Sequence, residues 1–166
     1  MTAIDNPFFE TWTTPFGVPP FSRIKPEHFM PAFERAFAEH DAEIARIAGD
    51  AAPPSFANTI VPLENAGRAL QRVDDIFGQL VGTDSNDAML KVETEISPKT
   101  AAHWNKVRMN AALFARIDAL FKTRDSLGLT PEQARVLERH HTEYRRGTPG
   151  IGRGCADVGE SHLGQA

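Results

Sequence analysis

Apolar residues recur every three or four positions along this chain, and this spacing constrains the fold more than any other feature. Such a period gathers side chains on one face of an α-helix. The clearest seam alternates steps of four and three: Phe56, Ile60, Leu63, Gly67, Leu70, Asp74, Phe77 and Val81. No segment shows the sustained alternation of a strand bounded by hairpin turns. The sequence therefore predicts an all-α fold, a bundle of about five helices.

Prolines and small polar residues predict where the helices begin and end. We expect the first helix to start near Glu27 or His28, which places Pro31 in the first turn, where its missing N–H matters least. The Pro-Pro pair at 53–54 ends this helix. Its apolar face carries Phe33, Phe37, Ile44 and Ile47. His40 falls on the same stripe, and a hydrogen-bonded histidine at the edge of the core is favoured over a metal ligand, because no second ligand is in register.

The second helix carries the seam 56–81, with Ser55 or Asn58 as its cap. Asp74 interrupts the apolar stripe. Gly67 inside a helix is less favourable than alanine by about 1 kcal/mol, so we expect it to permit a close crossing of another helix.

Two further helices follow a turn at 84–87. The first of them carries Met89, Val92 and Ile96, and Ser97-Pro98 restarts the chain as a cap followed by a proline. The helical pattern then continues through Trp104 to Phe121, and Gly128 closes it. The sequence predicts no interruption between 98 and 121.

The last helix opens with a capping box at 130–133, Thr-Pro-Glu-Gln. It presents Leu137, His141 and Tyr144 on one side and ends at Arg-Arg-Gly, 145–147, with basic residues at the negative end of the helix dipole. The chain thus divides into an extended Pro-rich segment at 1–25, a helical domain at 26–146 and a Gly-rich tail at 147–166. The tail holds half of the glycines and few apolar residues, so we expect it to be disordered.

Composition excludes several classes of function. A formal charge of -4 and a pI near 5.8 leave no basic surface for nucleic acid. The N-terminal residues lack the features of a signal peptide and no stretch is apolar enough to span a bilayer, so we expect a cytoplasmic protein with no membrane partner. Cys155 is the single cysteine, which excludes an internal disulfide. A thiol with no matching histidine or aspartate pattern is better interpreted as a bystander than as a nucleophile.

Three short motifs suggest binding chemistry, and each has a simpler interpretation. The Gly-rich run 150–154 resembles a phosphate loop, but no strand precedes it. Glu138 and His141 have the spacing of a di-iron ligand pair, but the second pair and two further glutamates are missing. Adjacent His140 and His141 point about 100° apart on a helix, so they offer at most a weak surface metal site. We therefore expect no catalytic, cofactor-binding or metal-binding residue in this chain.

Several blocks in a fixed order carry a family resemblance. They are residues 21–34, 56–67, 83–90, 110–121, 124–129 and 136–140. These blocks resemble the N-terminal region of the zinc metallopeptidases that include thimet oligopeptidase, oligopeptidase A and bacterial peptidyl-dipeptidase. The resemblance runs from about residue 6 to about residue 146, and its last three blocks are most similar to peptidyl-dipeptidase. After residue 147 the sequence departs from the family, whose members continue with further amphipathic helices.

The resemblance implies an all-helical part of a peptidase without its chemistry. Family members bind zinc through a His-Glu-x-x-His helix, and none of the six histidines here begins that motif. The family hydrolyses oligopeptides, and peptidyl-dipeptidases release C-terminal dipeptides. We expect this chain to be inactive alone and to form part of the wall of the substrate channel, with the missing catalytic half as its partner and short peptides as substrates. The alternative is a stand-alone helical module that binds another protein in a groove.

Overall fold

Helices account for the regular structure of the protein. A computed structural model describes residues 5–84 and 86–147, and within these ranges no strand is present. The α-helices are α1 (Pro26–Ala48), α2 (Val61–Asn65), α3 (Arg68–Thr83), α4 (Asp87–Arg108), α5 (Ala111–Thr123) and α6 (Pro131–Gly147). Five of them are long and α2 is a single short segment. The predicted all-α bundle of about five helices is confirmed.

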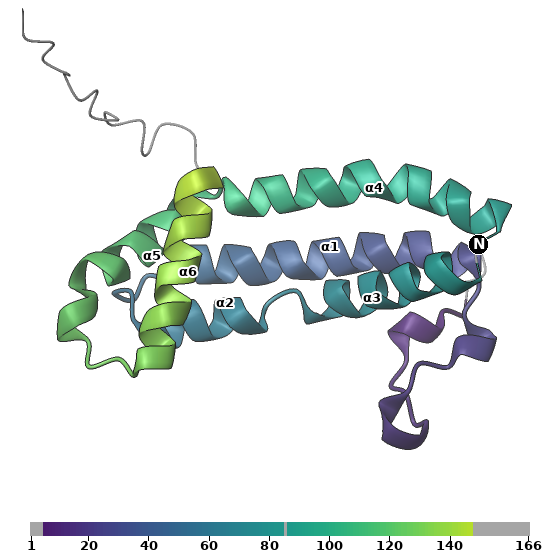
Figure 1. Cartoon of the computed structure of the whole chain (residues 1–166), viewed down its shortest axis with the longest axis horizontal. Coiled ribbons are helices and arrows are strands. Elements are labelled where there is room, and N and C mark those ends of the chain that lie inside the picture. The colour runs from purple at the N-terminus through teal and green to yellow at the C-terminus, as the bar shows by residue number, and fades with distance from the viewer. Residues whose placement is uncertain (1–4, 85, 148–166) are drawn as a thin grey trace, which may run out of the picture.

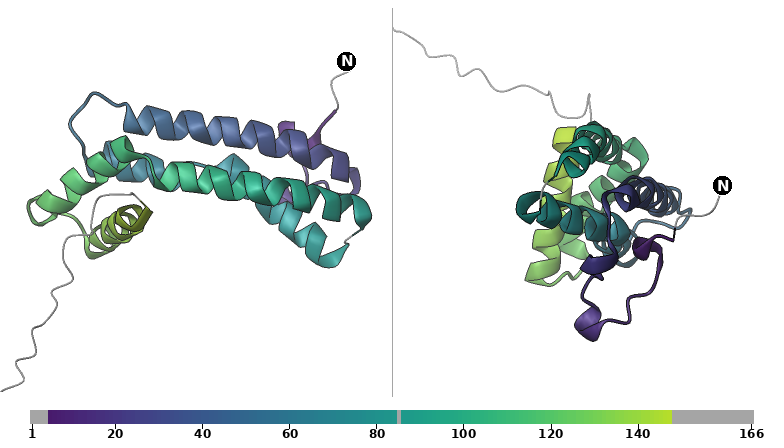
Figure 2. Two further views of the ribbon diagram at one scale, coloured as in Figure 1. Left: turned by 90° about the horizontal axis from the view of Figure 1, so that it is seen from above. Right: turned by 90° about the vertical axis from the view of Figure 1, so that its right-hand side faces the viewer.

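Helix α1 is the centre of the bundle, and α2, α3, α4 and α5 all contact it (Figure 1). α3 packs against its N-terminal part and α4 runs beside it, whereas α5 and α6 pack against each other at its far end. The views in Figure 2 show α4 running beside α1 and α6 crossing near the end of both. None of the helices in the described part of the chain is long and apolar enough to cross a membrane.

The core has two halves, one at each end of α1. The first is aromatic: Phe29 and Phe33 of α1 are fully buried, and the Phe77 ring of α3 meets them edge-on at centroid distances of 5.0 and 5.6 Å. The second is mainly aliphatic and joins α1 to α5 and α6 through Ile44, Ile47, Ile60, Leu113, Ile117, Leu120 and Leu137. The stripes predicted for α1 and α6 lie in these clusters.

The limits of α1 differ from those predicted. The helix begins at Pro26, and Pro31 lies inside it in the second turn. Pro31 leaves only the carbonyl of Glu27 without its helical partner. Glu27 is exposed, so water can replace that bond, and the packed face that follows holds the helix together. The helix ends at Ala48, several residues before the proline pair at 53–54, because Gly49 caps it. The prediction that the prolines end it is wrong.

Arg116 of α5 fixes the path of the chain after α1. Its guanidinium is buried and donates to the carbonyl oxygens of Asp50 and Ala52 at 2.6 and 3.1 Å and to the Oδ1 of Asn58 at 3.1 Å. These charge-assisted bonds tie the loop 49–55 to the second half of the core. An arginine in the middle of an apolar helix was the only signal for this role in the sequence.

The seam 56–81 is not one continuous helix. Gly67 has a left-handed conformation, with φ at +74°, and it separates α2 from α3. The prediction of Gly67 inside a helix is therefore wrong, whereas the close approach expected there is present. A Cβ atom at this position would lie 3.2 Å from the His40 ring.

Two predictions on the segment 97–121 are also wrong. Pro98 lies within α4, and the chain does not restart there. Pro98 lacks the N–H that would bond the Thr94 carbonyl, and Thr94 is exposed, so water can satisfy this carbonyl. Ile96 and His103 hold the helix on both sides of the proline. The real break comes at Met109, where α4 ends, and Asn110 caps α5 by accepting from the Leu113 amide at 3.0 Å.

Predicted caps are confirmed at two other helix starts. Ser55 and Asn58 form a reciprocal capping box before the turn Phe56–Ile60, with bonds of 2.8 and 3.1 Å. Thr130 and Gln133 form the box that opens α6, with bonds of 3.0 and 3.3 Å. The predictions for the tail, including Cys155 and the run 150–154, lie outside the described residues.

Candidate functional site: a groove between α3 and α4

Two histidines meet in the middle of the bundle. His40 of α1 and His103 of α4 are both buried, and their Nδ1 and Nε2 atoms lie 2.8 Å apart. One nitrogen must donate and the other accept, so the bond requires at least one neutral ring. The expectation of a hydrogen-bonded histidine at position 40 is confirmed. The sequence did not identify its partner, which is 63 residues away.

Charged side chains lie near the histidine pair, at longer distances than the hydrogen bond between the two rings. Asp41 of α1 lies 3.7 Å from His103 Nδ1 and forms an ion pair with Lys106 at 2.6 Å. Glu43 accepts a 2.7 Å hydrogen bond from the Gly67 amide, which fixes the break between α2 and α3 against α1. Burial lowers the pKa of His40, and the neighbouring His103 lowers it further. Burial also lowers the pKa of His103, which Asp41 partly offsets.

The histidine pair should make the protein less stable in mild acid. Because both folded-state pKa values lie below the ordinary histidine value, the unfolded chain binds more protons once the pH falls below about 6.5. The stability is therefore fully present above that pH and is lost as the pH falls toward the lowered pKa values. Urea unfolding between pH 7.5 and 5.5 should show a decreasing free energy. His103→Gln should flatten this slope; an unchanged slope would contradict the assignment.

Next to the histidine pair, residues of α3 and α4 line a groove of about 460 Å³. Phe77 of α3 and Ile96 of α4 form its buried floor, and Trp104 of α4 forms a wall that is 36% exposed. The Trp104 ring meets His40 edge-on at a centroid distance of 5.3 Å, so the histidine pair positions it. The remaining lining residues are polar or small: Asp74, Glu93, Ser97, Thr100, Ala101, Asn105 and Arg108.

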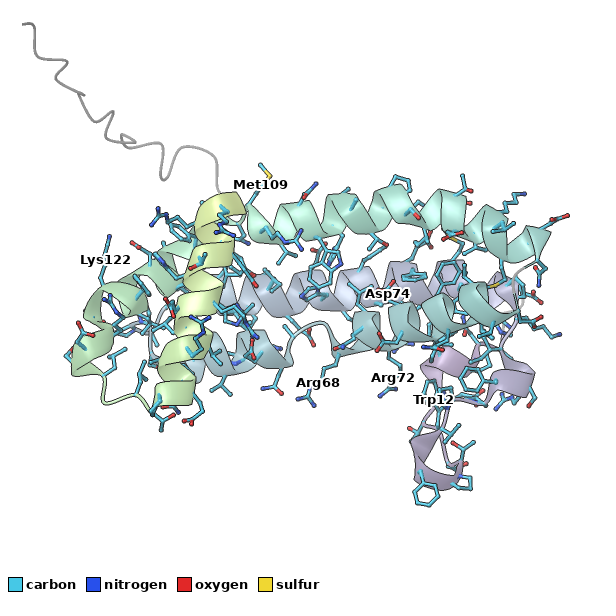
Figure 3. The ribbon with its side chains drawn as sticks, viewed as in Figure 1. Trp12, Arg68, Arg72, Asp74, Met109 and Lys122 are labelled. Atoms are coloured by element: carbon cyan, nitrogen blue, oxygen red, sulfur yellow. The ribbon has the colours of Figure 1, made fainter. Side chains whose placement is uncertain are left out.

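Asp74 is the acidic residue that interrupts the apolar seam of the sequence. Figure 3 shows it on the side of α3 that faces α4, opposite the side from which Arg68 and Arg72 project. Burial raises the pKa of Asp74, and the neighbouring Asp75 carboxylate raises it further. Among residues 5–84 and 86–147, neither Asp74 nor Glu93 has a hydrogen bond or ion pair through its carboxylate. The groove thus combines an apolar floor with acidic groups that lack a cation.

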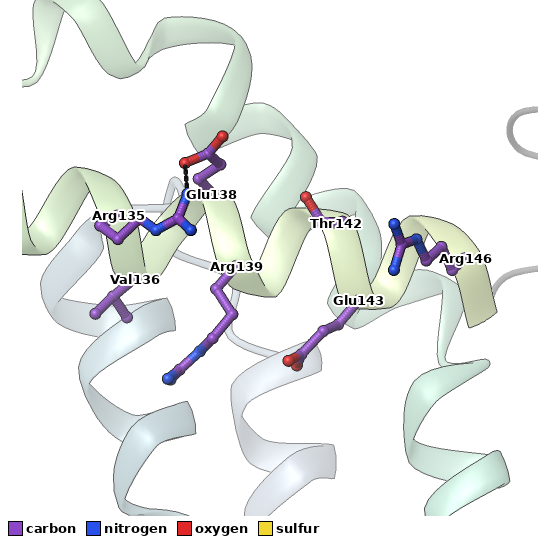
Figure 4. Close-up of a pocket in the computed structure, with 7 residues that line it drawn as sticks. All are labelled: Arg135, Val136, Glu138, Arg139, Thr142, Glu143 and Arg146. Carbon is purple, nitrogen blue, oxygen red and sulfur yellow. Dashed lines mark hydrogen bonds and ion pairs between the residues drawn. The ribbon is translucent and has the colours of Figure 1, made fainter.

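A second hollow of about 450 Å³ lies along α6 (Figure 4). Its lining comes from one helix alone, with Arg135 and Glu138 joined by a 2.6 Å ion pair. Side chains from one convex helix surface do not converge on a ligand, so this hollow is the weaker candidate.

The histidines of α6 bind carboxylates of neighbouring helices. His140 Nε2 lies 2.5 Å from Glu64 of α2, and His141 Nε2 lies 3.2 Å from Asp118 of α5. His141 also stacks on Phe121 with a centroid distance of 3.8 Å. Glu138 pairs with Arg135 and His141 with Asp118, so the two residues of the Glu138/His141 motif bind different partners.

The donor groups of the described residues do not fit a peptidase zinc site. In the described ranges no cluster of three or more histidine, cysteine, aspartate or glutamate side chains could hold a metal ion. The two histidines that meet, His40 and His103, have their nitrogens 2.8 Å apart, whereas two nitrogens on a tetrahedral zinc lie roughly 3.3 Å apart. No catalytic step is therefore assigned to zinc at these residues.

The described residues form a helical bundle with a surface groove, and sequence comparison identifies relatives of this chain. The chain is 37% identical over 139 residues to the dipeptidyl carboxypeptidase of Escherichia coli and 35% identical over 139 residues to that of Salmonella typhimurium. Each match covers 84% of this chain and 20% of the relative. Oligopeptidase A of Salmonella typhimurium is 35% identical over 83 residues, which are 50% of this chain and 11% of the relative. No family model matches the chain.

The chain is therefore similar to dipeptidyl carboxypeptidases and, over a shorter stretch, to oligopeptidase A. The resemblance to the N-terminal region of these enzymes is confirmed. The chain spans about one fifth of the length of the dipeptidyl carboxypeptidases it matches.

Proposed function

We propose that this bundle forms part of the wall of a substrate channel in a peptidyl-dipeptidase-like zinc metallopeptidase. The enzyme hydrolyses oligopeptides and releases C-terminal dipeptides in the cytoplasm. The observation that carries the proposal is the 37% identity to a dipeptidyl carboxypeptidase over 84% of this chain. It extends through α1 to α6, so the match concerns a whole bundle and not one motif.

Within this proposal the chain contributes shape and contacts, and the chemistry belongs to a catalytic half. The zinc of the family supplies an activated water for peptide hydrolysis. The described side chains do not fit its ligand set, so its ligands lie in the catalytic half. The bundle contributes rigid helices whose caps and aromatic core hold one wall in place. Short peptides are the substrates of the assembled enzyme.

Exposed apolar side chains are consistent with the proposed partner of the bundle. Those with more than a third of their surface exposed are Phe9, Phe16, Val18, Phe21, Val61, Leu90, Trp104, Met109 and Leu127. Surface of this kind is covered in interfaces that resemble a domain core cut in two.

The groove between α3 and α4 also supports the second candidate, a stand-alone helical module that binds another protein.

Co-expression separates these two candidates. The partner is the part of Escherichia coli dipeptidyl carboxypeptidase that follows its matched region. We expect a soluble complex with one copy of each, which cleaves a blocked tripeptide, whereas the chain alone self-associates in light scattering and is inactive. A control lacking residues 148–166 should form the complex equally well, because that tail has no amphipathic pattern. If the chain alone is monomeric and forms no complex with the peptidase fragment, the stand-alone module is favoured.

A further inference from the structure

The groove between α3 and α4 carries an inference about the partner itself. We propose that it is the docking site of an amphipathic helix from the catalytic half, which places an apolar side chain between Phe77, Ile96 and Trp104 and a lysine or arginine against Asp74. The inference rests on the proposed function, because it takes the peptidase as the source of that helix.

The shape of the groove favours a helix over a compact ligand. The α4 wall runs from Glu93 to Arg108, a rise of about 22 Å, so a helix of about four turns fills its length. Its walls are themselves helices, whose main-chain groups are bonded internally along most of their length. An extended peptide would find few main-chain partners there, whereas a helix satisfies its own N–H and C=O groups.

Apolar contact supplies the anchor of this interaction. Phe77 and Ile96 already form a buried floor, so a side chain that enters the groove meets packed atoms without reorganising the core. Trp104 is held from below by His40 and His103 at centroid distances of 5.3 and 5.8 Å. A tryptophan fixed in this way and still 36% exposed gains burial at little entropic cost when a helix covers it.

The acidic residues that line the groove favour a partner helix with basic side chains. Asp74 is partly withdrawn from water, and its pKa is raised mainly by that burial and then by Asp75. A cation from the partner would stabilise the charged form of the Asp74 carboxyl, which burial and Asp75 disfavour. Glu93 offers a second acidic group on the facing wall. Arg108 at the other end of the groove favours an acidic residue near that end of the docked helix, which sets its direction.

A second copy of this chain is a poorer occupant. In a two-fold dimer each groove faces the same groove of the other copy. Where the two-fold axis passes near Asp74 or Glu93, the unpaired carboxylate would face its own equivalent across an apolar floor, and this like-charge contact opposes association.

The test measures the NMR signal of the Trp104 indole with and without the partner. The chain has two tryptophans, so labelling it with ¹⁵N-tryptophan gives two indole signals, and Trp12→Phe assigns them. In the complex with the unlabelled fragment of Escherichia coli dipeptidyl carboxypeptidase, we expect the Trp104 indole to shift and to become protected from solvent. Asp74→Lys should weaken the complex by tenfold or more, on the order expected for a charge reversal in a buried contact.

Asp75→Lys is the matched control. Asp75 is the next residue of the same helix, points about 100° away and does not line the groove, so its reversal should change the affinity by no more than about twofold. A complex that forms with an unchanged Trp104 signal and tolerates Asp74→Lys would overturn the docking site and leave the proposed function standing. Absence of any complex would overturn both. A Trp104 shift that depends on the concentration of the isolated chain would assign the groove to a second copy and contradict the inference.

Discussion

Phe77→Ala should lower the free energy of unfolding by about 3–5 kcal/mol, the usual range for removing a buried phenylalanine. Phe77 is 6% exposed and its ring contacts Phe29 and Phe33, so the substitution removes both burial and two edge-on aromatic contacts. Collapse around the cavity is limited because its neighbours belong to the long helix α1, which other helices hold in place. Urea unfolding at pH 8, above the histidine titration, measures the change.

Phe9→Ala is the comparison for this substitution. Phe9 is 42% exposed and its ring lies under the Arg35 guanidinium at 4.7 Å, so we expect a loss of about 1 kcal/mol or less. If Phe77→Ala also cost less than about 1 kcal/mol, the aromatic cluster would not be the stabilising half of the core, and the helical seam 70–81 would need another partner.

Gly67→Ala should destabilise the protein by about 1–3 kcal/mol, because an L-residue in the left-handed region is strained. The added methyl group would also lie 3.2 Å from His40 Nε2 and press on the histidine pair. Two effects therefore act in the same direction. We expect the loss in unfolding free energy to be accompanied by a change in the Trp104 environment, which tryptophan fluorescence in a Trp12→Phe background reports.

Gly78→Ala is the matched control and should have the opposite sign. Gly78 lies within α3 and is exposed, and a Cβ atom there meets no other atom within 4 Å. Alanine in a helix interior is more favourable than glycine by roughly 0.5–1 kcal/mol. If both substitutions stabilised the protein, the chain at Gly67 would be helical, as the sequence seam suggested, and the break between α2 and α3 would be wrong.

The histidine pair and the groove connect stability to the proposed interaction. Trp104 packs on His40, and His40 also limits the space at Gly67. A substitution at this junction therefore changes both the packing of α1 against α4 and the wall of the groove. For this reason the docking test uses the carboxylates of Asp74 and Asp75, which lie outside the histidine contacts.

Sequence alone determined the elements whose signals are local. The period of the apolar residues fixed the helical class, and the capping boxes at 55–58 and 130–133 fixed two helix starts, because each depends only on residues three or four positions apart. The ordered blocks of residues 21–140 likewise pointed to the peptidase relatives that comparison found.

Tertiary structure decided the features that depend on contacts across the chain. Pro98 stays within α4 because Ile96 and His103 are packed against α1, and Gly67 breaks its seam because Glu43 and His40 of α1 meet it there. The groove combines Asp74 with Trp104, 30 positions apart in the sequence, only because α3 and α4 pack along the same helix. Local periodicity carries no information about such pairs, since their energies arise from burial and charge in the assembled bundle.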